Sequence, residues 1–325
     1  MKVLLTHTPQ ARAQYYGERS LNGLQALADV KLHQGDGALD AFGLIAAARD
    51  ADIIVADRLT AGPSEIFPRL PKLRAFVRCA VDIRNIDVDA ASKAGVLVTQ
   101  AGPGFVQSVT ELALGFMVDL SRGVSRASAD YHAGRKPKII MGRQLAGSRI
   151  GIIGYGSIGR YLAGIARTLG MEVLVADPLA TVNEPGISHV SLDDLLGQSD
   201  FVVCLAVANE KTENLIGQAA LARMQPHAFF INLSRGNLVD ETALMAALRE
   251  NRIAGVAMDV GRALDQMPTL ELAKLPNVIA TPHIGGLTPP AIESQSLETV
   301  RQVEKIIAGE IPVGAVNAGH WTRRR

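Results

Sequence analysis

Three side chains that can bind or move charge follow short apolar segments of the chain. Arg235 comes after Phe229–Leu233, Asp259 after Ala254–Met258, and His283 after Val278–Thr281. Each segment has the length of a buried strand, and ligands of open α/β sheets bind beyond the carboxyl ends of the strands. A guanidinium matches a carboxylate with two parallel hydrogen bonds, and an imidazole gains or loses a proton near neutral pH. Each residue alone is common in loops, so the prediction of a catalytic site depends on their combination.

A turn suited to a pyrophosphate precedes these residues. The run Gly154-Tyr155-Gly156-Ser157-Ile158-Gly159 fits G-x-G-x-x-G and lies between an apolar segment, Arg149–Ile153, and a segment with helical periodicity. Gly154 permits the sharp turn, Gly156 lets a pyrophosphate approach the backbone, and Gly159 lets the helix pack on the strand. The free N–H groups and the dipole at the start of the helix favour the anion.

An acidic residue stands where a ribose would be bound. Asp177 ends the next apolar run, Val173–Ala176, and lies 18 residues after Gly159. A carboxylate there accepts hydrogen bonds from an adenosine ribose and repels a 2′-phosphate. The sequence therefore predicts NAD as the cofactor in preference to NADP.

Strand-like and helix-like segments alternate along the whole chain. The pattern predicts parallel sheets covered on both faces, and thus an α/β fold. We expect a first part at residues 1–100, a dinucleotide-binding domain at 101–284, and a return to the first domain at 285–325, with a hinge where the chain crosses. Gln107–Arg122 reads as a long helix, and Ser125–Ala146 as a polar, irregular segment.

Composition narrows the class of protein. The chain has 325 residues, a net charge of +1, 48% hydrophobic residues and two cysteines. This balance gives no reason to expect a nucleic-acid partner, and no apolar run is long enough to cross a membrane. Cys79 and Cys204 have no metal-binding or redox spacing, so we expect buried thiols, no metal site and a cytoplasmic protein. Arg323–Arg325 reads as a solvated tail.

Four segments give the chain a resemblance to a known family. They are Asn85-Ile86-Asp87 with Ala90, Ala91 and Gly95, and the runs GIIGYGSIGR, FFINLSRGNLVDETAL and NVIATPHIGGLT. With them the chain resembles the D-isomer-specific 2-hydroxyacid dehydrogenases over almost its whole length. The resemblance implies two doubly wound parallel-sheet domains, with a Rossmann dinucleotide-binding domain inserted into a flavodoxin-like substrate domain. It also implies hydride transfer between NAD and a small 2-hydroxy or 2-oxo acid.

The resemblance assigns roles to individual residues. Arg235 would bind the substrate carboxylate and carbonyl, and His283 would protonate the carbonyl oxygen in reduction and take the proton back in oxidation. Asp259 would hold the nicotinamide carboxamide, and Asp177 the ribose. The remaining residues expected to contact the cofactor are Gly154, Gly156, Ser157, Ile158, Gly159, Val207, Leu233, Ser234, Gly285 and Gly286.

The chain departs from the family pattern at three places. The family usually has a Glu, paired with the His, where this chain has Leu264, so Asp265 is expected to replace it, with Gln266 as the weaker candidate and an unaided His283 as the alternative. The glycine-rich substrate loop reads Arg78–Arg84, without glycines and with an added Asp82. Val207 replaces a usual proline.

The substrate and the partners are less narrowly predicted. Arg58 and Arg78 follow strand-like runs and, with Arg235, predict a basic substrate site that also includes Val81. We therefore expect a small substrate with a second anionic group, D-3-phosphoglycerate among the candidates, unless Asp57 and Asp82 pair with these arginines. The segment from Gln107 onward resembles the part of relatives that forms a dimer contact, so a homodimer is expected.

Two other functions compete with a hydroxyacid dehydrogenase. The missing Glu and the altered loop would suit an NAD-sensing protein akin to the corepressor members of the family, although such a sensor needs no proton donor. An NAD-dependent enzyme of another family, such as an amino-acid dehydrogenase, would need a catalytic lysine, and the segments around Arg235 and His283 argue against it.

Overall fold

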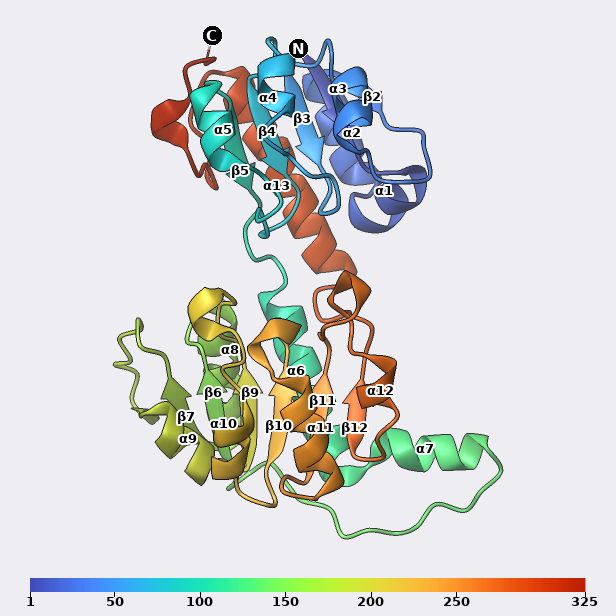
Figure 1. The fold of residues 1–325 in the computed structure, drawn as a ribbon, viewed down its shortest axis with the longest axis vertical. Helices are drawn as coiled ribbons and strands as arrows, with labels where there is room; N and C mark the ends of the chain where they lie inside the picture. The colour runs from blue at the N-terminus through green and yellow to red at the C-terminus, as the bar shows by residue number, and fades with distance from the viewer. Residues whose placement is uncertain (325) are drawn as a thin grey trace. The chain divides into compact units, whose positions relative to one another are not determined.

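The computed structural model describes residues 1–324, apart from the side chain of Asp265. It divides into two units, each an α/β domain with one parallel sheet (Figure 1). Unit 1 comprises Met1–Gly104 and Pro289–Arg325, and unit 2 comprises Phe105–Thr288. Both boundaries lie four residues after those expected from the sequence. The α/β class with parallel sheets is confirmed.

Unit 1 contains a five-stranded parallel sheet in the order β2-β1-β3-β4-β5, which is the order of flavodoxin-like folds. Its strands are β1 (Lys2–Leu5), β2 (Asp29–Leu32), β3 (Ile53–Ala56), β4 (Ala75–Arg78) and β5 (Leu97–Gln100). Its helices are α1 (Pro9–Tyr15), α2 (Glu18–Leu27), α3 (Ala41–Ala47), α4 (Ile66–Arg69), α5 (Val88–Lys93) and α13 (Pro289–Ile307), followed by a short 3₁₀ turn, η4 (Ala318–His320).

The two faces of this sheet are covered by different helices. Helices α3, α4 and α5 bury Leu44, Phe67 and Ala91 against one face. Helices α2 and α13 bury Leu24 and Val303 against the other face. Because β1, β3 and β4 are buried on both sides, they are almost wholly apolar, as the sequence pattern predicted.

Unit 2 contains a seven-stranded parallel sheet in the order β12-β11-β10-β9-β6-β7-β8, with the Rossmann reversal between β6 and β9. Its strands are β6 (Arg149–Ile153), β7 (Glu172–Ala176), β8 (Ile187–His189), β9 (Phe201–Cys204), β10 (Phe229–Asn232), β11 (Gly255–Met258) and β12 (Val278–Ala280). Its helices are α6 (Val106–Arg122), α7 (Val124–His132), α8 (Ser157–Thr168), α9 (Leu192–Gln198), α10 (Gln218–Arg223), α11 (Glu241–Arg249) and α12 (Leu270–Ala273), with 3₁₀ turns η1 (Glu210–Thr212), η2 (Gly236–Leu238) and η3 (Leu264–Gln266).

Helices also cover both faces of the second sheet. Helices α6 and α8 pack Phe116 and Leu162 on one face, and α9, α10 and α11 pack Leu195, Leu221 and Leu244 on the other. Because all strands run in the same direction, their carboxyl ends meet at one edge. The turns after β6, β10, β11 and β12 therefore all lie at the carboxyl edge of one sheet.

The sequence prediction for residues 125–146 is partly wrong. Val124–His132 forms helix α7, and this helix buries none of its residues. The helix is short and mostly polar (VSRASADYH), so its sequence offers few of the apolar positions on which the longer helices were predicted. Strands β2 and β8 were also not predicted. They lie at the edges of their sheets, and their residues are exposed or only partly buried, so neither has a continuous apolar run.

The prediction of a solvated tail is wrong for Arg323, which is half-buried, whereas Arg324 is exposed and Arg325 lies outside the described residues. Arg323 donates to the carbonyl oxygens of Leu70 and Leu73 at 2.7 and 2.9 Å. The guanidinium of Arg324 lies 5.6 Å from the centre of the Trp321 ring. Arg323 is thus held in place because its guanidinium satisfies carbonyl oxygens just after α4, and the Arg324 guanidinium donates to the Gly309 carbonyl after α13.

Candidate functional site

The glycine turn between β6 and α8 has the geometry that a dinucleotide requires. Gly154 has a φ of +97°, and a Cβ on it would lie 2.7 Å from the backbone nitrogen of Ala206. A Cβ on Gly159 would overlap the Gly154 carbonyl, so the helix packs directly on the turn. Around Gly156, in contrast, a Cβ would meet no atom within 4 Å, and no side chain caps the start of α8. The start of α8, with Ser157 and Ile158, therefore offers open space and N–H groups to an anion.

Asp177 lies at the end of β7, beside this turn. One carboxylate oxygen accepts the Tyr155 N–H at 2.7 Å, and the other accepts the Leu179 N–H at 2.9 Å. Burial raises the pKa of Asp177, but hydrogen bonds from these backbone groups outweigh burial and hold the pKa below its usual value. The Ala180 N–H also bonds this carboxylate, and since a carboxylate has about four acceptor sites, one site remains for a further donor.

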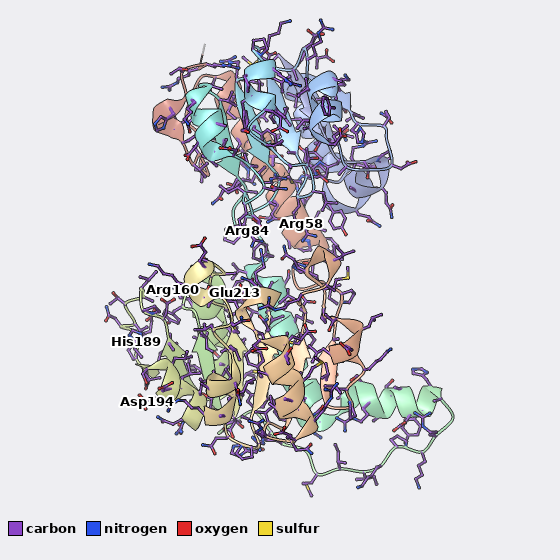
Figure 2. All side chains as sticks on the ribbon, in the orientation of Figure 1. Arg58, Arg84, Arg160, His189, Asp194 and Glu213 are labelled. Atoms are coloured by element: carbon purple, nitrogen blue, oxygen red, sulfur yellow. The ribbon has the colours of Figure 1, made fainter. Side chains whose placement is uncertain are left out.

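Arg160 of α8 lies near the same turn. Its guanidinium lies 4.5 Å from the centre of the Tyr155 ring and forms a 3.0 Å ion pair with Glu184. Figure 2 labels Arg160 on this helix. The cation is thus engaged by an aromatic ring and a carboxylate within unit 2.

Asp259 follows β11 and is 2% exposed. One carboxylate oxygen accepts the Thr281 hydroxyl at 2.6 Å and the Ile284 N–H at 2.8 Å, and the other accepts the Gly285 N–H at 2.8 Å. These donors flank His283, whose φ is +56°. Asp259 therefore stabilises a turn in which His283 has a left-handed backbone, a conformation that costs energy in a residue other than glycine. One acceptor site on the carboxylate remains for a cofactor amide.

Arg235 follows β10 in a turn that is fixed by its own neighbours. The buried Asn232 donates from its side-chain amide to the Arg235 carbonyl at 2.9 Å and accepts the Ser234 N–H at 3.1 Å. Arg235 is half-buried and donates to the Ser234 carbonyl at 2.7 Å. The role of Asn232 was missed by sequence reasoning, although its place in the run INLSRG, just before the functional turn, was visible.

The other predicted cofactor residues lie along the same edge. The hydroxyl of Ser234 donates to the carbonyl of Ala206, which directly precedes Val207. Val207 is 77% exposed, whereas Leu233 is 8% exposed. Gly285 is buried and Gly286 half-buried in the turn that Asp259 stabilises. The predicted residues of unit 2 are thus gathered at the carboxyl edge of its sheet.

The loop Gly261–Pro268 holds the predicted partners of His283. Asp265 was the first candidate, and its side chain lies outside the described residues. Gln266, the second candidate, has a φ of +61°, and its Oε1 is buried without a hydrogen-bond partner among the described residues. Leu264, at the expected Glu position, is 92% exposed. The pairing of His283 therefore stays a prediction.

The predicted substrate residues of unit 1 differ in their surroundings. Arg58 is exposed and Val81 half-buried, and Figure 2 labels Arg58 and Arg84 in this unit. Asp82 forms a 2.6 Å ion pair with Arg84.

Arg78 is completely buried. Its terminal nitrogens donate to the carbonyls of Asp57 and Thr60 and to Oδ1 of Asn85. Burial lowers the pKa of Arg78 to about 10, so it remains charged at neutral pH. Arg78 thus holds the loops after β3 and β4 together, and its terminal nitrogens are already engaged. Asp57 does not accept a hydrogen bond from it through its carboxylate, which instead binds Thr6 and Thr60.

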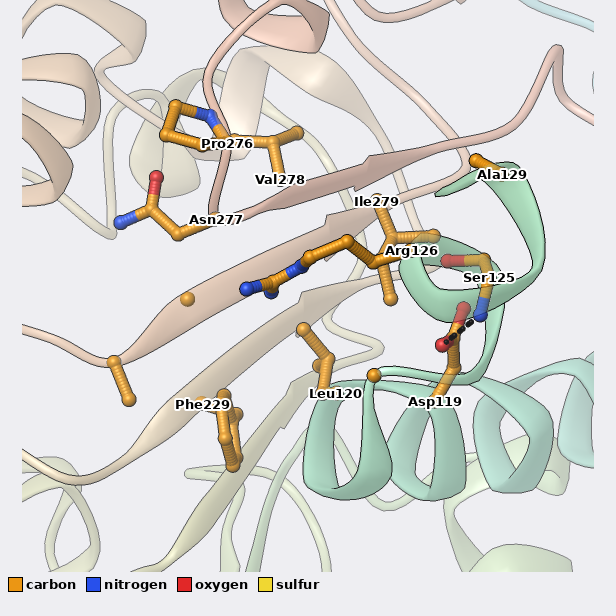
Figure 3. A pocket seen from close by; sticks show the side chains of 13 residues that line it. Asp119, Leu120, Ser125, Arg126, Ala129, Phe229, Pro276, Asn277, Val278 and Ile279 are labelled. Atoms are coloured by element: carbon orange, nitrogen blue, oxygen red, sulfur yellow. Dashed lines mark hydrogen bonds between the residues drawn. The ribbon is translucent and has the colours of Figure 1, made fainter. Parts of the chain in front are cut away.

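A pocket of about 330 Å³ lies elsewhere in unit 2 (Figure 3). It is lined by Asp119, Leu120, Ser125 and Arg126 of α6 and α7, and by residues such as Phe229, Gly255 and Val278. These last three are the first residues of β10, β11 and β12. The pocket therefore lies at the amino edge of the sheet, away from the predicted cofactor turn.

Both cysteines are buried, and burial raises the pKa of each thiol to about 12.

Within residues 1–324, apart from the Asp265 side chain, no group of His, Cys, Asp and Glu side chains could hold a metal ion. The helices in this part of the chain are also too short or too polar to span a membrane.

The chain is similar in sequence to proteins of a known family. The family model for the D-isomer specific 2-hydroxyacid dehydrogenase, NAD binding domain, matches residues 114–285. A D-3-phosphoglycerate dehydrogenase of Escherichia coli (strain K12) is 35% identical over 308 residues, which are 92% of this chain and 75% of that protein. A D-3-phosphoglycerate dehydrogenase of Mycobacterium leprae (strain TN) is 33% identical over 282 residues, 86% of this chain. The chain spans only 53% of the length of the mycobacterial relative.

A solved structure also shares the fold. A glyoxylate reductase from Paecilomyes thermophila superposes with a TM-score of 0.85 at 25% identity, covering 98% of this chain and 99% of that one.

Proposed function

Because this chain belongs to the D-isomer specific 2-hydroxyacid dehydrogenase family, we propose that it transfers a hydride between NAD and a small 2-hydroxy or 2-oxo acid. One observation carries the proposal: the turns with Gly156, Arg235 and His283 lie on the carboxyl edge of the same sheet. Ligands of such sheets bind at that edge.

The residues fit the cofactor. The open space at Gly156 and the uncapped start of α8 suit a pyrophosphate, and the Asp177 carboxylate retains one acceptor site for a ribose hydroxyl. When bound, NADH supplies the hydride that reduces the carbonyl carbon of the substrate. Asp259 would direct its remaining acceptor site to the carboxamide, and Leu233, Ser234, Val207, Gly285 and Gly286 would line the cofactor.

Two side chains would act on the substrate. Arg235 would bind the carboxylate with two charge-assisted hydrogen bonds and so orient the carbonyl group. His283, as imidazolium, would donate its proton to the carbonyl oxygen during reduction and, as neutral imidazole, accept it during oxidation. Asp265 is proposed to stabilise the imidazolium, in place of the Glu that the family usually has.

The substrate is proposed to carry a second anionic group. The relatives in Escherichia coli and Mycobacterium leprae are named D-3-phosphoglycerate dehydrogenases, and D-3-phosphoglycerate has both a carboxylate and a phosphate. Of the two arginines predicted for this group, exposed Arg58 is the better candidate, because Arg78 is buried and its terminal nitrogens are engaged. We propose that Arg58 and Val81 contact the substrate.

A homodimer is proposed from the surface of unit 2. Helix α7 buries none of its residues, and it exposes Val124 and Tyr131. The segment after it exposes Ile139 and Met141 at 92% and 98%. Such an apolar surface is stabilised when a second copy covers it. The two buried, unlinked cysteines are compatible with the reducing cytoplasm, where we propose that the protein works.

The proposal is tested by following NADH oxidation with a panel of 2-oxo acids that differ in tail charge. Reduction of at least one acid supports the dehydrogenase, and faster reduction of dianionic acids supports the role of Arg58. Tight NADH binding without reduction of any acid would instead favour an NAD sensor.

A further inference from the structure

Arg262 lies in the loop Gly261–Pro268 that follows β11, and its side chain reaches two neighbouring loops. Its Nε donates to the Val239 carbonyl at 3.1 Å. One terminal nitrogen lies 2.9 Å from a carboxylate oxygen of Glu213 and 3.1 Å from the Asn237 carbonyl. The guanidinium therefore connects the loop after β11 with the loops after β9 and β10.

Glu213 completes the connection from the loop after β9. Its second carboxylate oxygen accepts the Asn237 side-chain amide at 2.8 Å. Figure 2 labels Glu213 in this unit. The hydrogen bond from Asn237, and then that from Arg262, lowers the pKa of Glu213, so the carboxylate stays charged near neutral pH.

The loop after β11 and the turn after β10 also contact each other through their backbones. A Cβ on Gly236 would overlap the carbonyl group of Gly261. The loop after β11 is itself closed, because the Gly261 N–H donates to the Gln266 carbonyl at 2.7 Å and the Ala263 N–H to the Met267 carbonyl at 3.0 Å. A shift of one loop is therefore transmitted to the other.

This location matters because the joined loops carry functional residues. Gly236 directly follows Arg235, which is proposed to bind the substrate carboxylate. The loop of Arg262 follows Asp259 and contains both predicted partners of His283, Asp265 and Gln266. The Arg262 and Glu213 side chains are 36% and 43% exposed, so their ion pair adds little to global stability.

We propose that Arg262 is a positioning residue of the reaction: it holds the loop Gly261–Pro268 against the turn that carries Arg235. The proposal rests on the proposed dehydrogenase function, but the ordering of the loop does not require activity. The planar guanidinium directs N–H groups of fixed geometry to oxygen acceptors on both neighbouring loops, a geometry that neither a glutamine amide nor a lysine ammonium reproduces.

The test compares Arg262→Gln with a matched variant, Arg143→Gln. Arg143 forms a 2.9 Å ion pair with Asp200, with side chains 34% and 25% exposed, and Asp200 immediately precedes β9, at the opposite edge of the sheet. Hydrogen–deuterium exchange of residues 259–268 is measured in each variant, together with kcat, KM and NADH affinity. For Arg262→Gln we expect faster exchange in this segment and a 10- to 100-fold lower kcat, with NADH affinity within about twofold of wild type.

Arg262→Lys should recover part of kcat, and Arg143→Gln should leave both exchange of residues 259–268 and kcat unchanged. Unchanged exchange in Arg262→Gln would overturn the proposal, as would faster exchange with unchanged kcat. If wild type reduces no 2-oxo acid, the proposed function fails, and the positioning role in that reaction falls with it, whereas the exchange comparison still shows whether Arg262 orders the loop.

Discussion

The Asp259 carboxylate accepts the backbone N–H of Ile284 at 2.8 Å, directly after His283. The same carboxylate binds Thr281 and Gly285, so a buried charge at the end of β11 defines the turn after β12. A histidine that moves a proton must be held in one orientation. The relationship thus connects a residue proposed to contact the cofactor with the backbone geometry of the proposed acid.

We first predict the effect of Asp259→Asn. The substitution would replace one carboxylate oxygen with an NH2 group that faces a backbone N–H. The turn then loses a charge-assisted hydrogen bond, and two donors oppose each other. We expect kcat to fall 10- to 100-fold, about 1.4–2.8 kcal/mol, measured by NADH oxidation under saturating substrate. Asp87→Asn, which alters the cap of α5 in unit 1, is the control and should leave kcat unchanged. An Asp259→Asn variant with wild-type kcat would show that the turn does not need this carboxylate.

The second prediction concerns cofactor choice. The lowered pKa keeps Asp177 ionised, and we propose that it faces the ribose, so wild type should bind NADH more tightly than NADPH. Asp177→Asn removes the charge and keeps an acceptor oxygen, and should narrow the ratio of the two dissociation constants about tenfold, measured by fluorescence titration. Asp193→Asn, an exposed carboxylate paired with Arg223, should leave the ratio unchanged. Wild type with a preference for NADPH would contradict the position of the ribose.

The third prediction concerns Arg235. A lysine keeps the charge but cannot form two parallel hydrogen bonds with a carboxylate. Arg235→Lys should lower kcat/KM 10- to 1000-fold, whereas the NADH dissociation constant should change little, as measured by steady-state kinetics and titration. Arg149→Lys changes an arginine that pairs with Glu172 at the start of β6 and β7, and should be kinetically silent. Equal activity of Arg235→Lys would remove Arg235 from the substrate site.

The fourth prediction concerns pH and His7, which is 1% exposed at the end of β1. Burial lowers the pKa of His7 to about 4, opposed by Asp57 and assisted by Arg12 and Arg78. In the unfolded chain His7 binds a proton below about pH 6.5, whereas in the folded chain it does so only near pH 4. The free energy of unfolding therefore falls as the pH falls from about 6.5 toward 4. Between pH 7 and pH 5 the loss is about 2 kcal/mol.

Urea unfolding at pH 7 and pH 5 measures this loss. His7→Gln should remove about 2 kcal/mol of the difference between the two pH values, whatever its effect on stability at pH 7. His320→Gln, at an exposed position of the same unit, should retain the wild-type difference. An unaltered pH dependence in His7→Gln would mean that His7 is not a buried neutral imidazole.

The sequence predicted the elements whose patterns are local. Apolar runs revealed the central strands because these are buried on both faces, and the glycine turn is specified by six consecutive residues. The place of Arg235, Asp259 and His283 at one edge followed from the parallel sheet. Helix α7 was not predicted, because none of its residues is buried within the chain.

Features that depend on distant contacts could not be predicted. Arg78 was predicted to face the substrate because it follows a strand, but its terminal nitrogens are bound by Asp57, Thr60 and Asn85 from other positions of unit 1. The connection of Arg262 to Glu213 spans 49 residues of sequence. Arg323 docks on carbonyl groups about 250 residues earlier in the chain. Spacing along the chain carries no signal for such contacts.

The most direct test of the central claim compares wild type with His283→Gln in NADH-dependent reduction of 2-oxo acids. We predict that wild type reduces at least one acid and forms the D-hydroxy acid. His283→Gln should bind NADH with unchanged affinity but lose at least 100-fold in kcat, about 2.7 kcal/mol. Wild type that binds NADH and reduces no acid in the panel, or a His283→Gln variant as active as wild type, would contradict the account.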